Sequence, residues 1–304
     1  MKLNDKPFIS NVIPTWNRYE EIIIAVKSIQ HYNYSDVEIL VCDNHSDEKI
    51  YNQLKSFCKE NNVKLFRNNT NIGMTANWNQ ALKLSQGSWV SLLCSDDEFL
   101  SNGFNKAYNY LKTLKKPCLV IQNPRLNKKK ILNPGYRAAR EINLPIASGN
   151  FIHRECFKQC GYFNENIQHS PDGEYWVRIS TKFKVIMYPE NFAKFNEHEK
   201  NNMFDSWLND NFIEQSLIII ELCNQHKKLK NNIDKQIIKW NYYIFFLKNS
   251  VGYLSRKKIT KKYLIKVLTF KNKSFKMYVD ISFLLALYLY RKSGIKKLIY
   301  DKSI

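Results

Sequence analysis

The chain has 304 residues, of which 44% are hydrophobic and 14% aromatic. This composition can bury a large core and excludes an intrinsically disordered chain, and the length allows one large domain or a catalytic domain with an appendage. Lys and Arg outnumber Asp and Glu by 47 to 27, which gives a formal net charge of +20. Such an excess favours phosphates, nucleic acids or anionic lipid head groups as partners, without choosing among them.

The cysteines and the N-terminus indicate the compartment. Seven scattered cysteines form no CxxC pair, which is typical of reduced thiols in a core. Lys2, Asp5 and Lys6 stand where a signal peptide has its apolar stretch, and no run reaches the ~18 apolar residues of a membrane span. We therefore expect a cytoplasmic protein that does not span the membrane.

Short apolar runs alternate with helix-length segments in the first part of the chain. The runs are rich in β-branched or large apolar side chains, as in strands buried on both faces, and the predicted strands are residues 8–13, 37–42, 63–66, 89–93 and 118–121. The segments between them have apolar residues at i, i+3 and i+4, and the predicted helices are residues 19–30, 48–60, 75–85 and 102–114. This order predicts an α/β fold with a mostly parallel central sheet and flanking helices, with ligand sites at the carboxyl ends of its strands.

The pattern changes twice farther along the chain. Residues 123–145 are basic, polar and rich in Pro, and we interpret them as a loop before a strand at 146–153, a helix at 172–182 and a strand at 184–188. From about residue 201 the strand signal ends, and long helical segments are predicted at 204–226, 234–254, 261–268 and 275–291. Residues 201–304 hold 20 Lys and Arg against 7 Asp and Glu. We therefore expect a catalytic domain at 1–200 and a basic helical region at 201–304.

Polar side chains follow the first two predicted strands. Thr15 and Asn17 come after the first strand, where they can cap the next helix or contact a ligand. Asp43 stands at the tip of the second strand and is the better ligand candidate, whereas Asp47 is placed to cap a helix.

The acidic run Asp96-Asp97-Glu98 follows the fourth predicted strand. Three neighbouring carboxylates at the tip of a buried strand repel one another unless a cation neutralises them. A divalent metal ion does so, and we interpret this run as a metal-binding turn in preference to a solvated one.

Two carboxylates and one histidine later in the chain are further candidates. Asp172 and Glu174 suit the positive end of the predicted helix at 172–182, and a capped helix alone explains both. Two residues are about 200° apart around a helix, so only one of the two can face a cleft. His198 lies in a polar loop, where most histidines are exposed to solvent.

Taken together, these segments resemble the family 2 glycosyltransferases of GT-A fold over roughly residues 7–202. The matching motifs, in the order of the family, are Pro14-Thr15-Trp16-Asn17-Arg18, Asp43-Asn44-His45-Ser46-Asp47, Asn71 and Gly73 followed by Asn77-Trp78-Asn79, Asp96-Asp97, and Asp172 six residues before Arg178. The resemblance implies a Rossmann-like catalytic domain that uses a nucleotide diphosphate sugar, with uracil as the most frequent base.

The resemblance also implies a role for each matching residue. Asp43 and Thr15 would hold the base and Asp96 the ribose, and Pro14, Asn17, Asn71 and Asn77 belong to the same nucleotide-sugar site. Asp97 would bind Mn²⁺ or Mg²⁺, with His198 as a further ligand or phosphate contact, and the metal would stabilise the departing diphosphate as a Lewis acid.

The implied reaction is an inverting transfer of a hexosyl or N-acetylhexosaminyl group, with Asp172 as the base that takes the proton from the acceptor hydroxyl. The acceptor would be a glycan or a lipid-linked saccharide in the synthesis of a bacterial surface polysaccharide.

The sequence departs from the family pattern at two positions. Cys94 replaces the first aspartate of a strict Asp-x-Asp motif, so the metal motif can be read as Cys94/Asp96 or as Asp96/Asp97. The catalytic Asp172 follows Pro171 where the family usually has a Glu.

The basic helical region and the overall charge leave alternatives open. Its aromatic-rich apolar faces beside lysines suit the inner face of an anionic membrane, and a soluble helical subdomain is the alternative. The charge also allows a nucleic-acid-binding protein, although no nucleic-acid-binding motif is present. The irregular acidic motif allows a nucleotide-sugar-binding protein without catalysis.

Overall fold

The computed structural model describes residues 6–196, apart from 136–137, 139–141, 143–146 and 168–170. His198, the domain boundary expected near residue 200 and the helices predicted beyond it lie outside the described residues.

Strand–helix units open the fold, as the sequence predicts. Their bounds are β1 Ile9–Thr15, α1 Glu20–Gln30, β2 Val37–Asp43, α2 Glu48–Glu60, β3 Lys64–Arg67, α3 Met74–Leu84 and β4 Trp89–Leu92. The remaining elements are β5 Glu98–Phe99, α4 Gly103–Lys112, β6 Cys118–Gln122, β7 Lys130–Leu132, β8 Phe151–His153, α6 Arg154–Cys160, α7 Pro171–Ser180, β9 Lys184–Tyr188 and β10 Ala193–Lys194.

The large sheet has the strand order β3-β2-β1-β4-β8-β6-β9-β7. β1 pairs in parallel with β2 and β4, β2 with β3, and β6 with β9, whereas β8 and β7 pair antiparallel to their neighbours. The expectation of a mostly parallel sheet is therefore confirmed, with two antiparallel strands in its second half. A separate small sheet joins β10 to β5, directly after the acidic turn.

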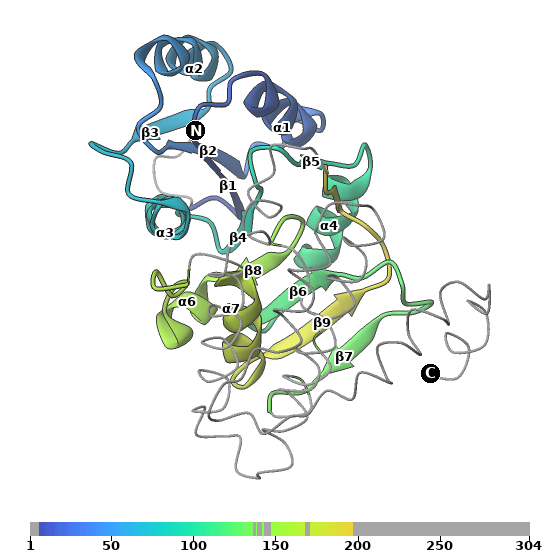
Figure 1. The fold of residues 1–304 in the computed structure, drawn as a ribbon. Helices are drawn as coiled ribbons and strands as arrows, with labels where there is room; N and C mark the ends of the chain where they lie inside the picture. Colours follow the sequence, from blue (N-terminus) through green and yellow to red (C-terminus); the bar gives the residue numbers. More distant parts are fainter. Residues whose placement is uncertain (1–5, 136–137, 139–141, 143–146, 168–170, 197–304) are drawn as a thin grey trace, which may run out of the picture.

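Helices cover both faces of the large sheet, as Figure 1 shows. One face packs against α3, α6 and α7, and the other against α1, α2 and α4. The side chains of β1 alternate between the two faces: Ile9 and Ile13 pack in the core on the side of α1, α2 and α4, and Val12 packs in the core on the side of α3, α6 and α7. Of the six cysteines that the structure describes, all are free and five are buried, as expected for reduced core thiols.

Three short elements differ from the sequence prediction. The predicted loop at 123–145 contains β7, a three-residue edge strand, and the strand predicted at 146–153 covers only Phe151–His153. α6 was not predicted, because seven residues are too few to show a helical period; His153 caps its first turn by accepting a hydrogen bond from the Glu155 N–H. Short elements depend on tertiary packing more than on local pattern.

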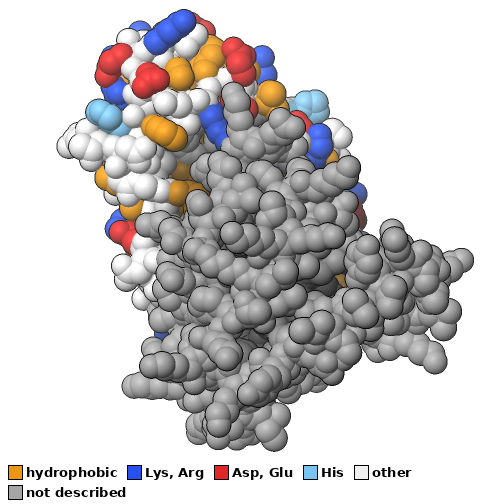
Figure 2. Space-filling view, in the orientation of Figure 1, with side chains coloured by type: hydrophobic (Ala, Val, Ile, Leu, Met, Phe, Trp, Pro, Cys, Tyr) orange, Lys and Arg blue, Asp and Glu red, His pale blue; other side chains and the backbone are white. Residues whose placement is uncertain are grey.

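The surface of the first half mixes both signs of charge. In the space-filling view, acidic and basic side chains are interspersed over the end of the molecule that carries α1 and α2 (Figure 2). No continuous basic surface is visible among the described residues at this end, which fits the concentration of positive charge in residues 201–304.

A buried glutamate joins three segments at the amino end of the sheet. The Glu38 carboxylate accepts hydrogen bonds from the Ser10 hydroxyl, from Lys64 Nζ at 2.6 Å and from the Gln86 N–H at 3.0 Å. Ser10 Oγ in turn accepts from the Gly87 N–H at 2.7 Å. Burial alone would raise the pKa of Glu38, but these hydrogen bonds outweigh burial and the pKa is lowered. Folding thus favours the ionised carboxylate.

We expect Glu38→Gln to lower the free energy of unfolding at neutral pH by about 1–3 kcal/mol, because buried charged hydrogen bonds are lost. The pKa is lowered on folding, so the contribution is present above the unfolded-state value and disappears as pH falls through the folded-state value. Urea unfolding at pH 7 and below about pH 4 measures the difference. Glu48→Gln is the matched control, because Glu48 pairs with Arg67 at 2.7 Å but is largely exposed. Equal effects of the two variants at pH 7 would contradict this prediction.

Candidate active site

The loops after β1, β2 and β4 meet at the carboxyl edge of the sheet. β1 lies between β2 and β4, and Thr15 at its end is in register with Asp43 at the end of β2. Across the edge on the other side, Arg18 forms an ion pair with Asp96, with 3.0 Å between Nη1 and Oδ2. The polar strand tips that the sequence singled out therefore lie together.

Asn17 connects the first two of these loops. Its backbone is left-handed, with φ of 52°, a conformation that Asn tolerates better than most residues. Its N–H donates to Ser46 Oγ at 2.8 Å, and its side-chain oxygen accepts from the Asp47 N–H at 2.8 Å. Asn17 thus links the loop after β1 to the loop after β2. The sequence analysis expected it in the nucleotide-sugar site.

Asp43 is fully buried at the tip of β2. Its carboxylate accepts hydrogen bonds from the Ser46 N–H and hydroxyl, and Arg67 Nε lies 3.4 Å away. The Arg67 guanidinium also stacks over the Tyr51 ring, 4.1 Å from its centroid. Neighbouring groups on the protein thus hold the charge of Asp43 in place.

Thr15 and Trp16 lie beside Asp43 at the same edge. Thr15 is buried, and its hydroxyl has no hydrogen-bond partner among the described residues. The next residue, Trp16, is 53% exposed, which is unusual for so large an apolar ring. The sequence analysis quoted Trp16 within its motif without giving it a role; its position directly after a strand tip was the available signal.

Asn77 and Asn71 both serve the loop between β3 and α3. Asn77 donates to the Cys42 carbonyl at 3.1 Å and accepts from Asn68 at 2.8 Å, so its side chain is occupied inside the fold. Asn71 accepts from the Gly73 N–H at 3.0 Å, and Gly73 has a φ of 85°, which favours glycine. The side chain of Asn77 therefore holds neighbouring loops of the site together inside the fold. Pro14 lies buried within β1, in register with Cys42.

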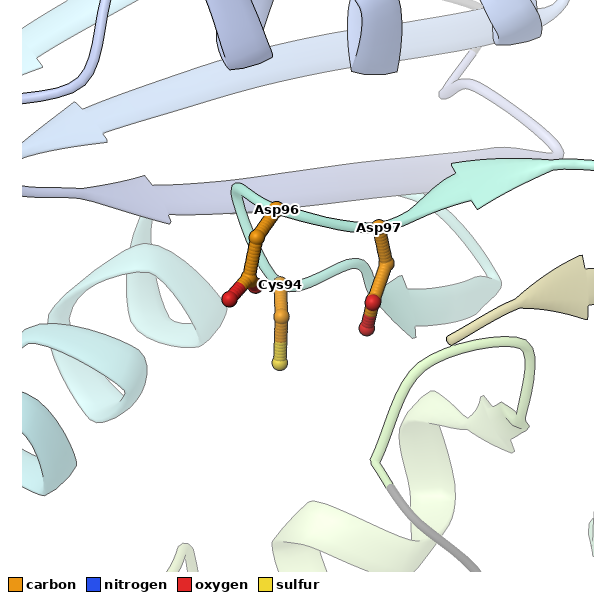
Figure 3. Close-up of side chains that lie close together, drawn as sticks. All are labelled: Cys94, Asp96 and Asp97. Atoms are coloured by element: carbon orange, nitrogen blue, oxygen red, sulfur yellow. The ribbon is translucent and has the colours of Figure 1, made fainter. Parts of the chain in front are cut away.

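The acidic turn after β4 brings Cys94, Asp96 and Asp97 together. One ligand atom of each lies within 4.8 Å of the other two, and the three side chains extend from the turn toward the same side (Figure 3). A thiol and two carboxylates are donors that divalent cations accept in proteins. By the chemistry of its donors and their spacing, this turn fits a metal ion.

The two aspartates of the turn have different surroundings. Asp97 is 2% exposed, and its oxygens accept from the Ser148 hydroxyl at 2.5 Å and from the Asn196 N–H at 3.1 Å. Burial, opposed by these hydrogen bonds, raises the pKa of Asp97 to about 6. Asp96 is more accessible and carries the ion pair with Arg18. Of the two carboxylates, that of Asp96 is therefore the one more open to solvent.

Asp172 and Glu174 have different surroundings, as expected for residues about 200° apart around a helix. Glu174 is buried and holds Arg178, with 2.7 Å from Oε1 to Nε and 2.7 Å from Oε2 to Nη2, while Arg178 also donates to the Tyr162 carbonyl at 2.9 Å. Among the described residues, no ion pair to Asp172 is found; its carboxylate accepts from the Gly173 N–H at 3.0 Å and from its own backbone N–H.

The surroundings of Asp172 point to the acidic turn. Burial raises the pKa of Asp172 to about 6. Burial also raises the pKa of the Cys94 thiol, and the charges of Asp97, Asp96 and Asp172 add to this effect. Asp172 therefore lies near enough to the turn to act on it electrostatically. His198, the other late candidate, lies outside the described residues.

Comparison with known proteins finds a family model, relatives and solved structures that match this chain. The model of the family described as glycosyl transferase family 2 matches residues 10–159. A GalNAc(5)-diNAcBac-PP-undecaprenol beta-1,3-glucosyltransferase of Campylobacter jejuni is 27% identical over 186 residues, which are 57% of this chain and 60% of the relative.

Two solved structures share the fold. The S. aureus protein TarS, residues 1–349 in complex with UDP-GlcNAc, matches with a TM-score of 0.66 and 16% identity over 86% of this chain and 79% of its own. The mannosyltransferase PcManGT of Pyrobaculum calidifontis, in complex with GDP-Man and Mn²⁺, matches with a TM-score of 0.56 and 14% identity over 86% of this chain and 84% of its own.

The strand order, the acidic turn at its carboxyl edge and the family match lead to one assignment: the chain belongs to glycosyl transferase family 2 and is a glycosyltransferase of GT-A fold.

Proposed function

We propose that the protein transfers a sugar, with inversion, from a UDP-sugar to a hydroxyl of a lipid-linked saccharide. The observation that carries this proposal is the acidic turn of Cys94, Asp96 and Asp97 beside Asp172, at the sheet edge that also presents Thr15 and Asp43. The acidic turn suits a diphosphate with its cation, the tips of β1 and β2 suit a nucleoside, and Asp172 suits a general base that accepts a proton.

The nucleoside half of the site lies at the tips of β1 and β2. The unused hydroxyl of buried Thr15 can hydrogen-bond a polar edge of the base, and the exposed Trp16 ring offers an apolar surface for stacking. Asp43 holds the loop in shape through Ser46 and Arg67. Uracil as the base is supported by the UDP-GlcNAc complex of the TarS structure, which shares the fold.

The diphosphate half of the site is the acidic turn. A Mn²⁺ or Mg²⁺ ion held there would stabilise the negative charge that develops on the departing diphosphate. We propose Asp96 as the carboxylate that meets the cation from the solvent side, with Asp97 behind it, tied to Ser148 and Asn196. The Mn²⁺ complex of the PcManGT structure supports a metal in this fold. His198 remains a proposed further contact.

The base of the reaction is Asp172. Direct displacement at the anomeric carbon needs one carboxylate to take the proton from the acceptor hydroxyl, and that carboxylate must be ionised and unengaged. Glu174 is engaged with Arg178, whereas Asp172 stands at the start of α7, whose N-terminus favours the ionised form.

The acceptor and its location rest on the relatives and on the sequence. The name of the Campylobacter jejuni relative specifies an undecaprenol-linked saccharide, and we propose an acceptor of the same class here, in the synthesis of a surface polysaccharide. None of the helices that the structure describes is long and apolar enough to cross a membrane. Contact of residues 201–304 with an anionic membrane surface stays a prediction from their charge and aromatic faces.

We expect Asp96→Asn to remove the gain in UDP affinity that Mn²⁺ provides. The UDP affinity measured with Mn²⁺ should fall by roughly 10–100-fold or more, whereas the affinity measured without metal should change little. Isothermal titration of the full chain with UDP, with and without Mn²⁺, measures both quantities. Glu98→Gln is the matched control, because Glu98 lies two residues away and contacts Lys194 only at 3.6 Å.

Asp97→Asn is expected to affect the metal less and the melting temperature more, because Asp97 links the turn to Ser148 and Asn196. A Mn²⁺ effect that survives Asp96→Asn but not Asp97→Asn would return the metal to Asp97, as the sequence assigned it. Absence of any UDP binding would count against the proposed function.

We expect Asp172→Asn to lower the transfer rate by roughly 10²–10⁴-fold, the usual worth of acid–base catalysis, with UDP affinity and folding retained. Glu174→Gln is expected to lower the stability instead, because it removes one charge of a buried ion pair that Arg178 completes. Single-turnover transfer and thermal unfolding of both variants test the division. Loss of transfer in a stable Glu174→Gln protein would move the base to Glu174.

The pH profile gives an independent check on the base. Because burial raises the pKa of Asp172 to about 6, transfer is expected to fall as pH drops through that value. The same shift means that the folded state binds the proton more tightly than the unfolded state, so ionising Asp172 costs stability as pH rises from about 4 to 6. Asp172→Asn should remove the contribution of Asp172 to both effects and leave that of Asp97, whose pKa is also raised to about 6. A rate profile of the wild type that is flat through pH 6 would contradict the assignment.

A further inference from the structure

Cys94 differs from the other cysteines that the structure describes. Of these six, Cys42, Cys58, Cys118, Cys156 and Cys160 are buried, and Cys94 alone is partly accessible. It follows β4 directly and stands in the acidic turn, where its Sγ lies within 4.8 Å of one carboxylate oxygen each of Asp96 and Asp97. A thiol this close to two carboxylates is poorly placed for core packing and well placed to share a cation with them.

The backbone holds this thiol toward the carboxylates. The Cys94 N–H donates to Ser148 Oγ at 3.0 Å, and the Ser148 hydroxyl donates to Asp97 at 2.5 Å. The Asp97 N–H donates to the Cys94 carbonyl at 2.9 Å, which closes the turn. The three side chains extend to the same side of this turn (Figure 3), with the sulfur within 4.8 Å of an oxygen of each carboxylate.

The sulfur changes which cation the turn prefers. Sites made of carboxylates and water suit Mg²⁺ and Mn²⁺, whereas thiolate ligands select softer ions such as Zn²⁺ and Cd²⁺. Mg²⁺ gains least from a sulfur ligand, because it is small, hard and reluctant to lose water. Replacing one oxygen donor by sulfur therefore lowers the affinity of the site for Mg²⁺ relative to its affinity for transition-metal ions.

We propose that Cys94 Sγ is a ligand of the metal at the acidic turn and that it makes the site selective for transition-metal and thiophilic cations over Mg²⁺. This inference rests on the proposed function, in which Asp96 and Asp97 hold a cation. On coordination the thiol releases its proton to solvent, and the S–metal bond forms without any change of oxidation state.

The test uses the full chain and Cd²⁺ alone, without nucleotide. Cd²⁺ bound to a thiolate absorbs in the ultraviolet by charge transfer from sulfur to metal, and bound to oxygen it does not. We expect this band in the wild type and in Cys223→Ser, which removes a different thiol, and no band in Cys94→Ser. Cys94→Asp, which restores an oxygen donor, is the second variant, and circular dichroism checks that each variant is folded.

A second arm compares UDP affinity in Mn²⁺ and in Mg²⁺. The wild type is expected to favour Mn²⁺ by at least about tenfold, and Cys94→Asp should narrow that ratio by raising the affinity in Mg²⁺. A Cd²⁺ band that is absent from the wild type or persists in Cys94→Ser, or a ratio unchanged in Cys94→Asp, would overturn the inference. A Cd²⁺ band that depends on Cys94, in a protein that binds no UDP with any cation, would instead support the metal ligand and count against the proposed donor.

Discussion

The parallel pairing of β1 with β2 on one side and β4 on the other is the constraint on which the site depends. Parallel strands end at the same edge, so Thr15, Asp43 and the acidic turn are brought together although they are far apart in sequence. The register fixes more than proximity, because Thr15 lies opposite Asp43. Buried Val12 and Ile13 keep that register by facing opposite cores, so a shift of one residue would exchange them.

The carboxylates gathered at one edge repel one another, and arginines and backbone N–H donors reduce this repulsion. Arg18 pairs with Asp96, and Arg67 lies against Asp43. Among the described residues, Asp97 accepts hydrogen bonds from the uncharged Ser148 hydroxyl and Asn196 N–H, and burial raises its pKa to about 6 although the charge of Arg18 opposes the rise. A divalent cation at the turn would compensate the carboxylate charge that burial disfavours.

Helix α7 separates a structural carboxylate from the proposed catalytic base within three residues. Glu174 and Arg178 are one helical turn apart and join α7 to the end of α6, since Arg178 also donates to the Cys160 and Tyr162 carbonyls. Asp172 acts on Cys94 electrostatically. Under the proposed function, the charge that accepts the proton is thus kept apart from the charge that is neutralised for stability.

The sequence by itself determined the strand–helix order, the mostly parallel sheet and the acidic turn, because long apolar periods and strand-end carboxylates are local signals. It could not determine β7, α6 or the antiparallel strands, which are short and depend on neighbours distant in sequence. Only the tertiary structure decided that Asn77 is occupied within the fold, that Glu174 belongs to Arg178, and that Asp96 is more accessible than Asp97. These distinctions depend on which partner each polar group finds across the sheet edge, and spacing along one chain does not encode that.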